Sequence, residues 1–134
     1  HIRFSDYWVQ TAQFRFDWKY PQRSYENFLN GISKARTFGF KHEIESLWER
    51  GLAKGGNLNN AILLDQNTIV NPEGFHFPNE LAAHKIIDAL GDFSLIGGPI
   101  LGRWELFEAG HEVHIRSLSE ALKANVFNID NGRA

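Results

Sequence analysis

Polar and apolar residues alternate along the first part of the chain. From Trp8 to Tyr20 the even positions are mostly aromatic or aliphatic, whereas the odd positions are mostly polar or charged. Side chains of a β-strand point alternately to its two faces, so this period of two predicts a strand with one buried face. Pro21 ends the strand, and Ser24 is the expected N-cap of a helix that carries apolar residues to Ile32.

Shorter elements are expected in the middle of the chain. A second helix is predicted over residues 42–50 and ends at a glycine. Residues 51–65 contain two apolar pieces separated by a Gly-Gly-Asn turn, which predicts two short strands. Another short strand is expected at 67–70, before a turn that contains proline and glycine.

The pattern changes to a helical period near residue 80. At about 100° per residue the helix has an apolar side and a polar side, which consist of Ala82, Ile86, Ala89, Leu90 and Phe93, and of His84, Lys85, Asp88 and Asp92. Residues four apart on a helix are neighbours, so His84 and Asp88 can converge on one metal ion, or they can both face water. The spacing alone favours the solvated interpretation, because many surface helices match it by chance.

The remaining pattern completes the expected fold. Residues 100–110 are a strand candidate, and residues 112–127 repeat apolar side chains with a helical period. Strands mixed with segregated helices predict an α+β fold, in which a mixed sheet packs on helices as a two-layer sandwich. The length of 134 residues fits a single domain over 1–134.

Composition excludes several classes of function. The net charge of −2, without any cluster of lysine and arginine, argues against a nucleic-acid partner. The chain has no cysteine, so a metal would be held by histidines and carboxylates. No apolar run approaches the ~20 residues of a membrane span, so we expect no transmembrane segment.

Single motifs do not identify the chemistry. The HEVH of residues 111–114 is not the His-Glu-x-x-His of zinc proteases, and taken alone it is more typical of a helix surface. A glycine-rich phosphate loop, a serine nucleophile elbow and a cysteine nucleophile are all missing from the sequence.

Four segments taken together are more specific. In chain order they are RTFGF at 36–40, GLAKGGNLNNAILLD at 51–65, NPEGFHFPNELAAHKIIDALGD at 71–92 and GRWELFEAGH at 102–111. Their order and spacing resemble the C-terminal half of UDP-3-O-acyl-N-acetylglucosamine deacetylase, a zinc enzyme of lipid A synthesis in Gram-negative bacteria. The resemblance covers about residues 10–123. It implies a cytoplasmic hydrolase that removes the N-acetyl group of a UDP-linked, acylated sugar.

The resemblance also implies roles for individual residues. His84 and Asp88 correspond to two zinc ligands, and Lys85 corresponds to a lysine placed against the substrate diphosphate. His111 corresponds to the histidine that stabilises the oxyanion and protonates the departing amine. Asp92 corresponds to the aspartate that orients this histidine.

The same resemblance assigns residues that contact the substrate. Thr37 corresponds to a threonine that hydrogen-bonds the reacting carbonyl region, and Phe38 to an aromatic residue that packs against the sugar. Residues 39–63 correspond to a helix-and-hairpin insert that forms an apolar passage for the fatty acyl chain. The residues expected to line it are Ile44, Ala53, Gly56, Asn57, Ala61 and Leu63.

Part of the implied active site is not in this sequence. In the family, an N-terminal half brings the third zinc ligand and a glutamate general base, so we expect that half as a partner. The chain has no methionine, as expected of a piece of a longer product. Two departures from the family are visible: Glu-Val-His-Ile follows His111 where Ala-Leu-Asn-Asn is common, and Gly98 stands where a histidine is common.

Two other interpretations stay open at this point. The chain could be a catalytically incompetent module that only binds the acyl-sugar or UDP part of the substrate. It could also be a small α+β domain whose His/Asp stripe is solvated. The agreement of several separate segments argues against the second of these.

Overall fold

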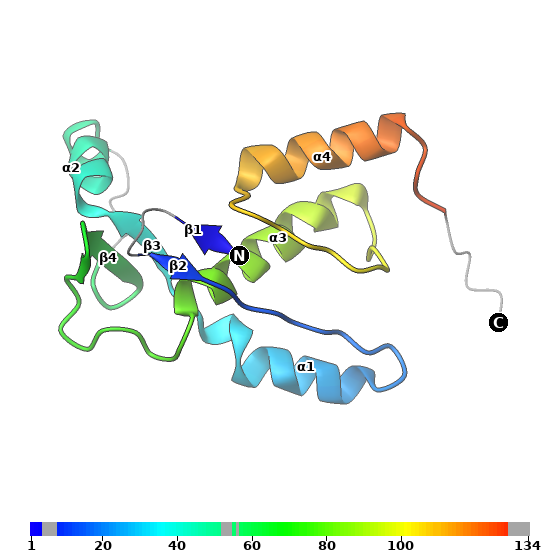
Figure 1. Ribbon diagram of the computed structural model, residues 1–134, viewed down its shortest axis with the longest axis horizontal. Coiled ribbons are helices and arrows are strands. Elements are labelled where there is room, and N and C mark those ends of the chain that lie inside the picture. The colour runs from blue at the N-terminus through cyan, green and yellow to red at the C-terminus, as the bar shows by residue number, and fades with distance from the viewer. Residues whose placement is uncertain (4–7, 52–54, 56, 129–134) are drawn as a thin grey trace.

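The computed structural model describes residues 1–3, 8–51, 55 and 57–128 (Figure 1). Within them the helices are α1 (Pro21–Asn30), α2 (Lys41–Glu49), α3 (Glu80–Phe93) and α4 (His111–Lys123), with short 3-10 turns η1 (Ile32–Lys34) and η2 (Ser94–Ile96). The strands are β1 (Ile2–Arg3), β2 (Val9–Gln10), β3 (Thr37–Phe40), β4 (Ala61–Asp65) and β5 (Thr68–Ile69). The expected α+β class is confirmed.

The larger sheet has the order β3-β4-β5 and is mixed, as predicted. β3 and β4 are parallel, with Thr37 opposite Ala61, and β4 and β5 are antiparallel. Parallel strands need a crossover connection, and α2 lies in the one that joins β3 to β4. Burial alternates along β4, where Ile62 and Leu64 are fully buried. One face of this sheet therefore belongs to the core.

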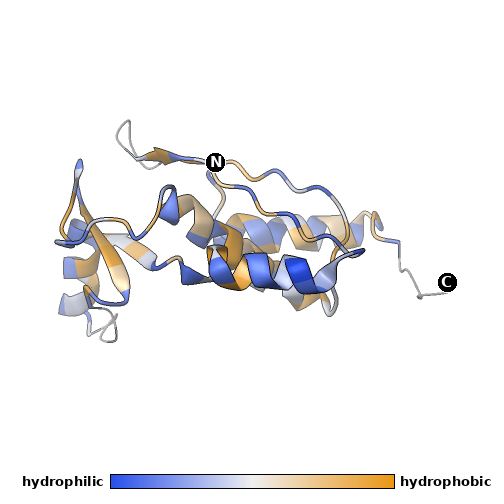
Figure 2. Ribbon diagram, turned by 90° about the horizontal axis from the view of Figure 1, so that it is seen from below, coloured by the Kyte–Doolittle hydropathy of each residue, from blue (hydrophilic) through white to orange (hydrophobic). Residues whose placement is uncertain are grey.

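The first turn of helix α3 packs against the core face of the sheet. It contributes Leu81 and Ala82 to a cluster with Ile62 and Leu64, and Trp8 joins them from the N-terminal segment. Burying a leucine or isoleucine side chain contributes about 1.5–3 kcal/mol, so these contacts fix α3 on the sheet. α4 packs alongside α3 (Figure 1). In Figure 2, α1 lies in front and presents mainly hydrophilic residues.

The predicted strand over residues 8–20 is wrong beyond β2. Residues 11–17 form no ladder, although the burial of Ala12 and Phe14 keeps the period of two. Ala12 packs against the core, and the Phe14 ring lies 5.7 Å from that of Phe28. A strand also needs a hydrogen-bonding neighbour, which an alternating sequence does not supply. The segment is therefore extended and half-buried without belonging to a sheet over most of its length.

Helix α1 begins earlier than predicted. Pro21 is its first residue, which suits a proline because the first helical N–H needs no partner. Ser24 is not the cap but a buried residue inside the helix, and its hydroxyl donates to the carbonyls of Asp17 and Tyr20. The sequence pattern placed the helix correctly and misjudged its first turn.

Two other strand predictions have different outcomes. The strand expected at 100–110 is wrong, since these residues form no strand and Glu108 has a φ of 52°. Leu101 and Phe107 stay exposed, so the apolar pattern of this segment does not reflect burial. The second piece of residues 51–65 is β4, whereas most of the first piece, residues 52–54, lies outside the described residues. No helix in the described part of the chain is long and apolar enough to cross a membrane.

Candidate metal and acid site

The polar side of α3 brings His84 and Asp88 together. One helical turn separates them, and Nε2 of His84 lies 3.3 Å from Oδ1 of Asp88. Their side chains are 17% and 14% exposed, so neither points freely into water. The solvated-stripe interpretation therefore does not describe this pair.

The contact of the other His84 ring nitrogen indicates the tautomer of the neutral ring. Nδ1 lies 3.3 Å from the carbonyl oxygen of Ala35, which can only accept, so Nδ1 carries the proton. In the neutral ring Nε2 then presents a lone pair to the Asp88 carboxylate. Two acceptors at this distance repel each other unless a positive charge lies between them.

The pair fits a zinc ion. Zinc bonds of about 2.0–2.2 Å at tetrahedral angles separate two ligand atoms by roughly 3.3–3.6 Å, which includes the 3.3 Å between His84 and Asp88. Imidazole and carboxylate are also ligands that zinc accepts. Two protein ligands are fewer than the three of a typical catalytic zinc site.

Lys85 neutralises Asp88 from the other side. Its Nζ lies 2.8 Å from Oδ2 of Asp88 and 5.3 Å from the centroid of the Phe38 ring. Phe38 also meets His84 edge-on, with ring centroids 6.2 Å apart. The first residues of β3 and the middle of α3 thus form one surface that combines an aromatic ring, a cation and the His/Asp pair.

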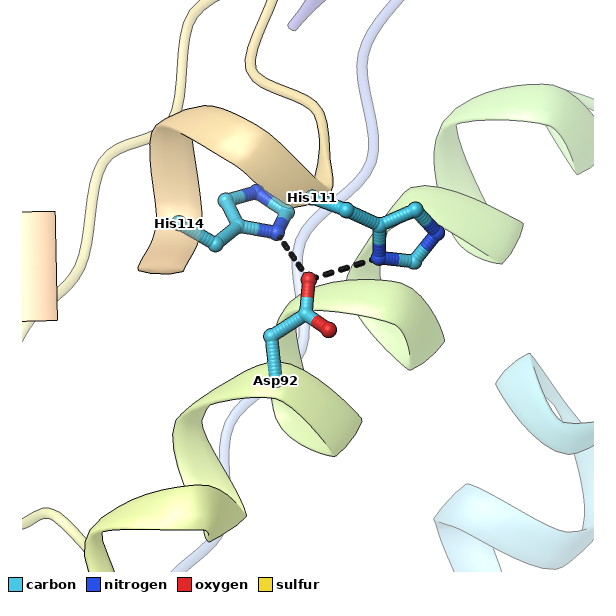
Figure 3. Close-up of side chains that lie close together, drawn as sticks. All are labelled: Asp92, His111 and His114. Carbon is cyan, nitrogen blue, oxygen red and sulfur yellow. Dashed lines mark hydrogen bonds and ion pairs between the residues drawn. The ribbon is translucent and has the colours of Figure 1, made fainter. Parts of the chain in front are cut away.

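The carboxylate of Asp92 accepts hydrogen bonds from two histidines of α4 (Figure 3). Nδ1 of His111 and Nδ1 of His114 each lie 2.7 Å from the same oxygen, Oδ2. His111 is mostly exposed, whereas His114 is buried. Burial would raise the pKa of Asp92, but the hydrogen bonds from His114 and His111, together with the charges those rings can carry, bring it below its ordinary value.

The ligand atoms of Asp92, His111 and His114 lie within 4.8 Å of one another, close enough to surround one metal ion. The 2.7 Å separations, however, are those of charge-assisted hydrogen bonds, and they are shorter than the roughly 3.3 Å between two ligands of one zinc ion. Asp92 is better described as the acceptor that orients both rings.

The His84/Asp88 pair and the His111/Asp92 pair face each other. Nε2 of His111 lies 4.0 Å from Oδ2 of Asp88, so the ring nitrogen that Asp92 leaves free points to the His84/Asp88 pair. A proton on this nitrogen would be within reach of a group bound beside the pair. The structure brings together the five α3 and α4 residues singled out in the sequence, His84, Lys85, Asp88, Asp92 and His111.

The residues expected to line the acyl passage lie around the sheet. Ala61 and Leu63 alternate with the buried residues of β4 and are half-buried. A Cβ at Gly39, which pairs with Leu63, would lie 2.8 Å from Cδ1 of Ile44. Asn57 is exposed at the turn before β4. Ala53 and Gly56 lie outside the described residues. Ile44, Gly39 and Leu63 therefore share one side.

Thr37 begins β3 and is exposed. Strand alternation directs it away from the face on which Phe38 meets α3, toward the face of Ala61. Its proposed contact with the reacting carbonyl stays a prediction.

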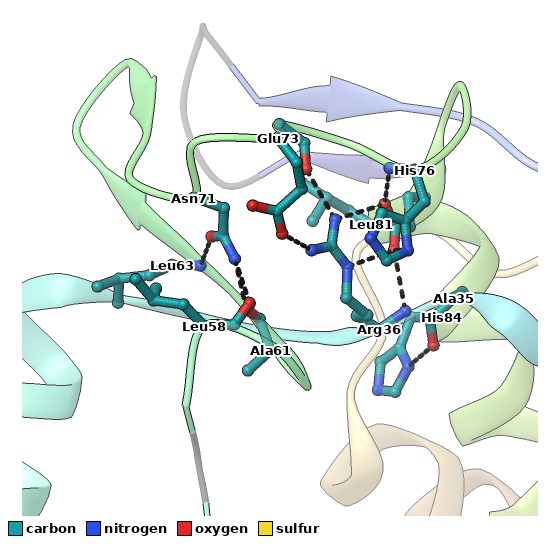
Figure 4. A network of polar contacts seen from close by, with 12 residues as sticks. Ala35, Arg36, Leu58, Ala61, Leu63, Asn71, Glu73, His76, Leu81 and His84 are labelled. Carbon is teal, nitrogen blue, oxygen red and sulfur yellow. Dashed lines mark hydrogen bonds and ion pairs between the residues drawn. The ribbon is translucent and has the colours of Figure 1, made fainter.

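A buried network holds the start of β3 against α3 (Figure 4). Nε of Arg36 lies 2.9 Å from Oε1 of Glu80, and its Nη1 lies 2.6 Å from Oε1 of Glu73. Glu80 is fully buried. Burial would raise its pKa, whereas hydrogen bonds from Arg36 and from the His76 N–H, with the charge of Arg36, leave it below the ordinary value.

Asn71 holds the turn before β4 in the same view. Its side chain donates to the carbonyls of Leu58 and Ala61 and accepts from the N–H of Leu63 (Figure 4). All of its hydrogen-bonding atoms are used, which explains why an asparagine that is 3% exposed is tolerated there.

Sequence reasoning missed two parts of this site. The HEVH segment was expected on a helix surface, which is correct for His111 and wrong for His114. The signal for His114 was its place one turn after His111, on the same side of α4. Arg36 and Glu80 are 44 residues apart, and no local pattern links them.

Comparisons with known proteins identify the family. The model of the family UDP-3-O-acyl N-acetylglycosamine deacetylase matches residues 1–123. A UDP-3-O-acyl-N-acetylglucosamine deacetylase from Campylobacter fetus subsp. fetus is 38% identical over 137 residues, which cover 99% of this chain and 45% of that protein. Proteins of the same name from a Nitratiruptor species and from Neisseria meningitidis serogroup A are 50% identical over 91 residues and 45% identical over 97 residues. These matches cover 68% and 72% of this chain, and 30% and 32% of those proteins.

The chain thus spans less than half the length of the curated relatives it matches. Its family is nevertheless defined by a match over nearly the whole sequence. By that match, the chain belongs to the UDP-3-O-acyl N-acetylglycosamine deacetylase family.

Proposed function

We propose that this chain provides part of the active site of a zinc-dependent deacetylase, which hydrolyses the N-acetyl group of a UDP-3-O-acyl-N-acetylglucosamine. In this proposal His84 and Asp88 are metal ligands and His111 is the general acid. The observation that carries it is the 3.3 Å approach of Nε2 of His84 to Oδ1 of Asp88, with the free nitrogen of His111 4.0 Å from the same carboxylate.

The reaction needs a proton at the departing nitrogen. A water oxygen adds to the acetyl carbonyl carbon, the C–N bond breaks, and the amine leaves only if it gains a proton. His111 is the candidate donor, because Asp92 holds its Nδ1 and leaves Nε2 toward the metal ligands. Zinc, when bound, would polarise the carbonyl and lower the pKa of its water.

The substrate contacts follow from the surroundings of the pair. Lys85 is a cation beside Phe38 and can bind a phosphate of the UDP group, with the ring against the sugar. Ile44, Ala61 and Leu63 offer apolar surface for an acyl chain, and Asn57, Ala53 and Gly56 are proposed to extend it. Thr37 is proposed to bind near the reacting carbonyl.

The remaining parts are proposed to come from the N-terminal half of the same enzyme. The relatives are more than twice as long as the region this chain matches. That half would supply the third zinc ligand and the base that activates water. Two ligands leave the ion loosely held, so we expect weak zinc binding and no measurable deacetylation by this chain alone.

Two measurements test this proposal. Zinc calorimetry is run on the wild-type chain, on Asp88→Asn and on His42→Ala, a control histidine on α2. Released acetate is assayed with the chain alone and after mixing with the N-terminal half. We expect binding that is lost in Asp88→Asn and kept in His42→Ala, and turnover only in the mixture.

Each result has a clear meaning. Robust turnover by the isolated chain would show that the third ligand or the base has been misplaced, with His114 and Glu112 the first residues to re-examine. Equal zinc binding by wild type and Asp88→Asn would reject the ligand pair. Substrate binding by the mixture without acetate release would favour an acyl-sugar binding module.

A further inference from the structure

A single peptide group connects two successive turns of α3. In the peptide group between Ala35 and Arg36, the carbonyl oxygen of Ala35 accepts from Nδ1 of His84 at 3.3 Å. The N–H of Arg36, at the opposite edge of this group, donates to Oε1 of Glu80 at 3.1 Å (Figure 4). Glu80 and His84 are four residues apart, so they project from the same side of the helix. Any tilt of this peptide plane changes both contacts at once.

Glu80 has little freedom to move. Its Oε1 also accepts from Nε of Arg36 at 2.9 Å, and its Oε2 accepts from Nη2 of Arg36 at 3.2 Å and from the N–H of His76 at 2.7 Å. The side chain is fully buried. A carboxylate held by four donors in a dry site is a rigid point to which the peptide plane is attached.

We propose that Glu80 is a positioning residue for His84. By fixing the Arg36 N–H it aims the Ala35 carbonyl at Nδ1, and so selects the tautomer that leaves Nε2 bare toward Asp88. The significance for metal binding rests on the proposed function. The positioning itself is a property of this chain without any metal. A hydrogen bond to the distal nitrogen of a metal-binding histidine sets both its ring orientation and its tautomer.

A purely structural ion pair would behave differently. If Glu80 served only to attach α3 to β3, its removal would lower stability and leave the tautomer of His84 unchanged. Glu73 offers a matched control, because its carboxylate pairs with the guanidinium of the same Arg36 from the exposed side and leaves the peptide N–H to Glu80.

The first test uses the metal-free wild-type chain at a pH where histidines are neutral. Nitrogen-15 NMR of the imidazole rings reports which nitrogen of His84 is protonated, and coupling across the hydrogen bond reports its acceptor. We expect proton occupancy on Nδ1 and coupling to the carbonyl carbon of Ala35. A wild-type ring protonated on Nε2 would overturn the proposal.

The second test compares three variants. Glu80→Met removes both carboxylate oxygens and should give a mixture of tautomers and a zinc affinity reduced about 10–100-fold. Glu80→Gln keeps an oxygen for the Arg36 N–H and should retain the wild-type tautomer. Glu73→Gln should match wild type in both readouts. A folded Glu80→Met chain with the wild-type tautomer and zinc affinity would overturn the proposal.

These readouts separate the two proposals. If Glu80→Met changes the tautomer while even the wild-type chain binds no zinc, the metal assignment fails and the positioning role stands. If wild type binds zinc and Glu80→Met alters neither readout, the positioning role alone fails. Should Glu80→Met not fold, the wild-type ring still tests the proposal, because a proton on Nε2 of His84, or no coupling to the carbonyl carbon of Ala35, would overturn it.

Discussion

Nδ1 of His114 lies 2.7 Å from Oδ2 of Asp92, and this contact joins α4 to α3 across 22 residues. The imidazole is buried, and its ring also meets that of Phe93 edge-on, with centroids 5.6 Å apart. His114 is therefore both a packing residue and a second donor to the carboxylate that orients His111.

We expect His114→Ala to destabilise the chain markedly. It removes a buried hydrogen bond to a charged acceptor, which contributes about 1.5–3 kcal/mol, and leaves a gap beside Phe93. His111→Ala, which removes an exposed ring from the same carboxylate, should cost less than about 1 kcal/mol. Urea unfolding at neutral pH measures both. Equal losses in the free energy of unfolding for the two variants would show that the burial of His114 does not strengthen its contact with Asp92.

Stability should fall in acid because of Glu80. Its pKa in the folded chain is below the ordinary 4.5, so its contribution to the free energy of unfolding is complete above about pH 4.5 and is lost as the pH falls through the lowered value. Urea unfolding between about pH 7 and pH 3 should show this slope, and Glu80→Gln should flatten it. Glu80→Gln should also be less stable than wild type at neutral pH, because the buried guanidinium of Arg36 loses the negative charge of its partner. An unchanged slope in Glu80→Gln would place the acid sensitivity elsewhere.

Much of the candidate site could be predicted from the sequence because it lies on one helix. The period of α3 separates apolar from polar positions, and the four-residue spacing of His84 and Asp88 already places them side by side. The Asp92–His111 contact came from the resemblance alone. Local patterns could not reveal the Arg36–Glu80 pair, which depends on how β3 approaches α3. The prediction of a strand over residues 8–20 was wrong for a related reason. Alternation of polar and apolar residues indicates which side chains are buried, but it does not show that a neighbouring strand is present.

Replacing Lys85 should have opposite effects on metal and substrate. Nζ of Lys85 neutralises Asp88, so Lys85→Met removes a positive charge from the proposed metal position and should raise zinc affinity about threefold to tenfold. In the complete enzyme the same variant should bind the UDP-sugar more weakly, because a phosphate loses a cation. Zinc calorimetry and substrate KM measure the two effects. A lower zinc affinity would show that Lys85 supports Asp88 and does not compete with the ion.

Ala61→Trp should block the proposed acyl passage. Ala61 is half-buried on the side of β4 that faces away from the core, where a large side chain would occupy the space next to Leu63. In the complete enzyme, KM for the long-chain substrate should rise at least about tenfold, whereas a substrate with a short acyl group should be affected little. Asn59→Trp, at the exposed turn, is the control. The passage assignment would be wrong if long-chain and short-chain substrates responded alike.

The parallel pairing of β3 with β4 limits how the insert can vary. Two parallel strands cannot be joined by a tight turn, so a chain that keeps this sheet must keep a long excursion between Phe40 and Ala61. None of the residues of α2 is buried, so the side chains of this helix can change at little cost to the core, whereas the connection itself cannot be deleted. Remodelling this connection would therefore change the proposed acyl passage and leave in place the strand that holds Phe38 against His84.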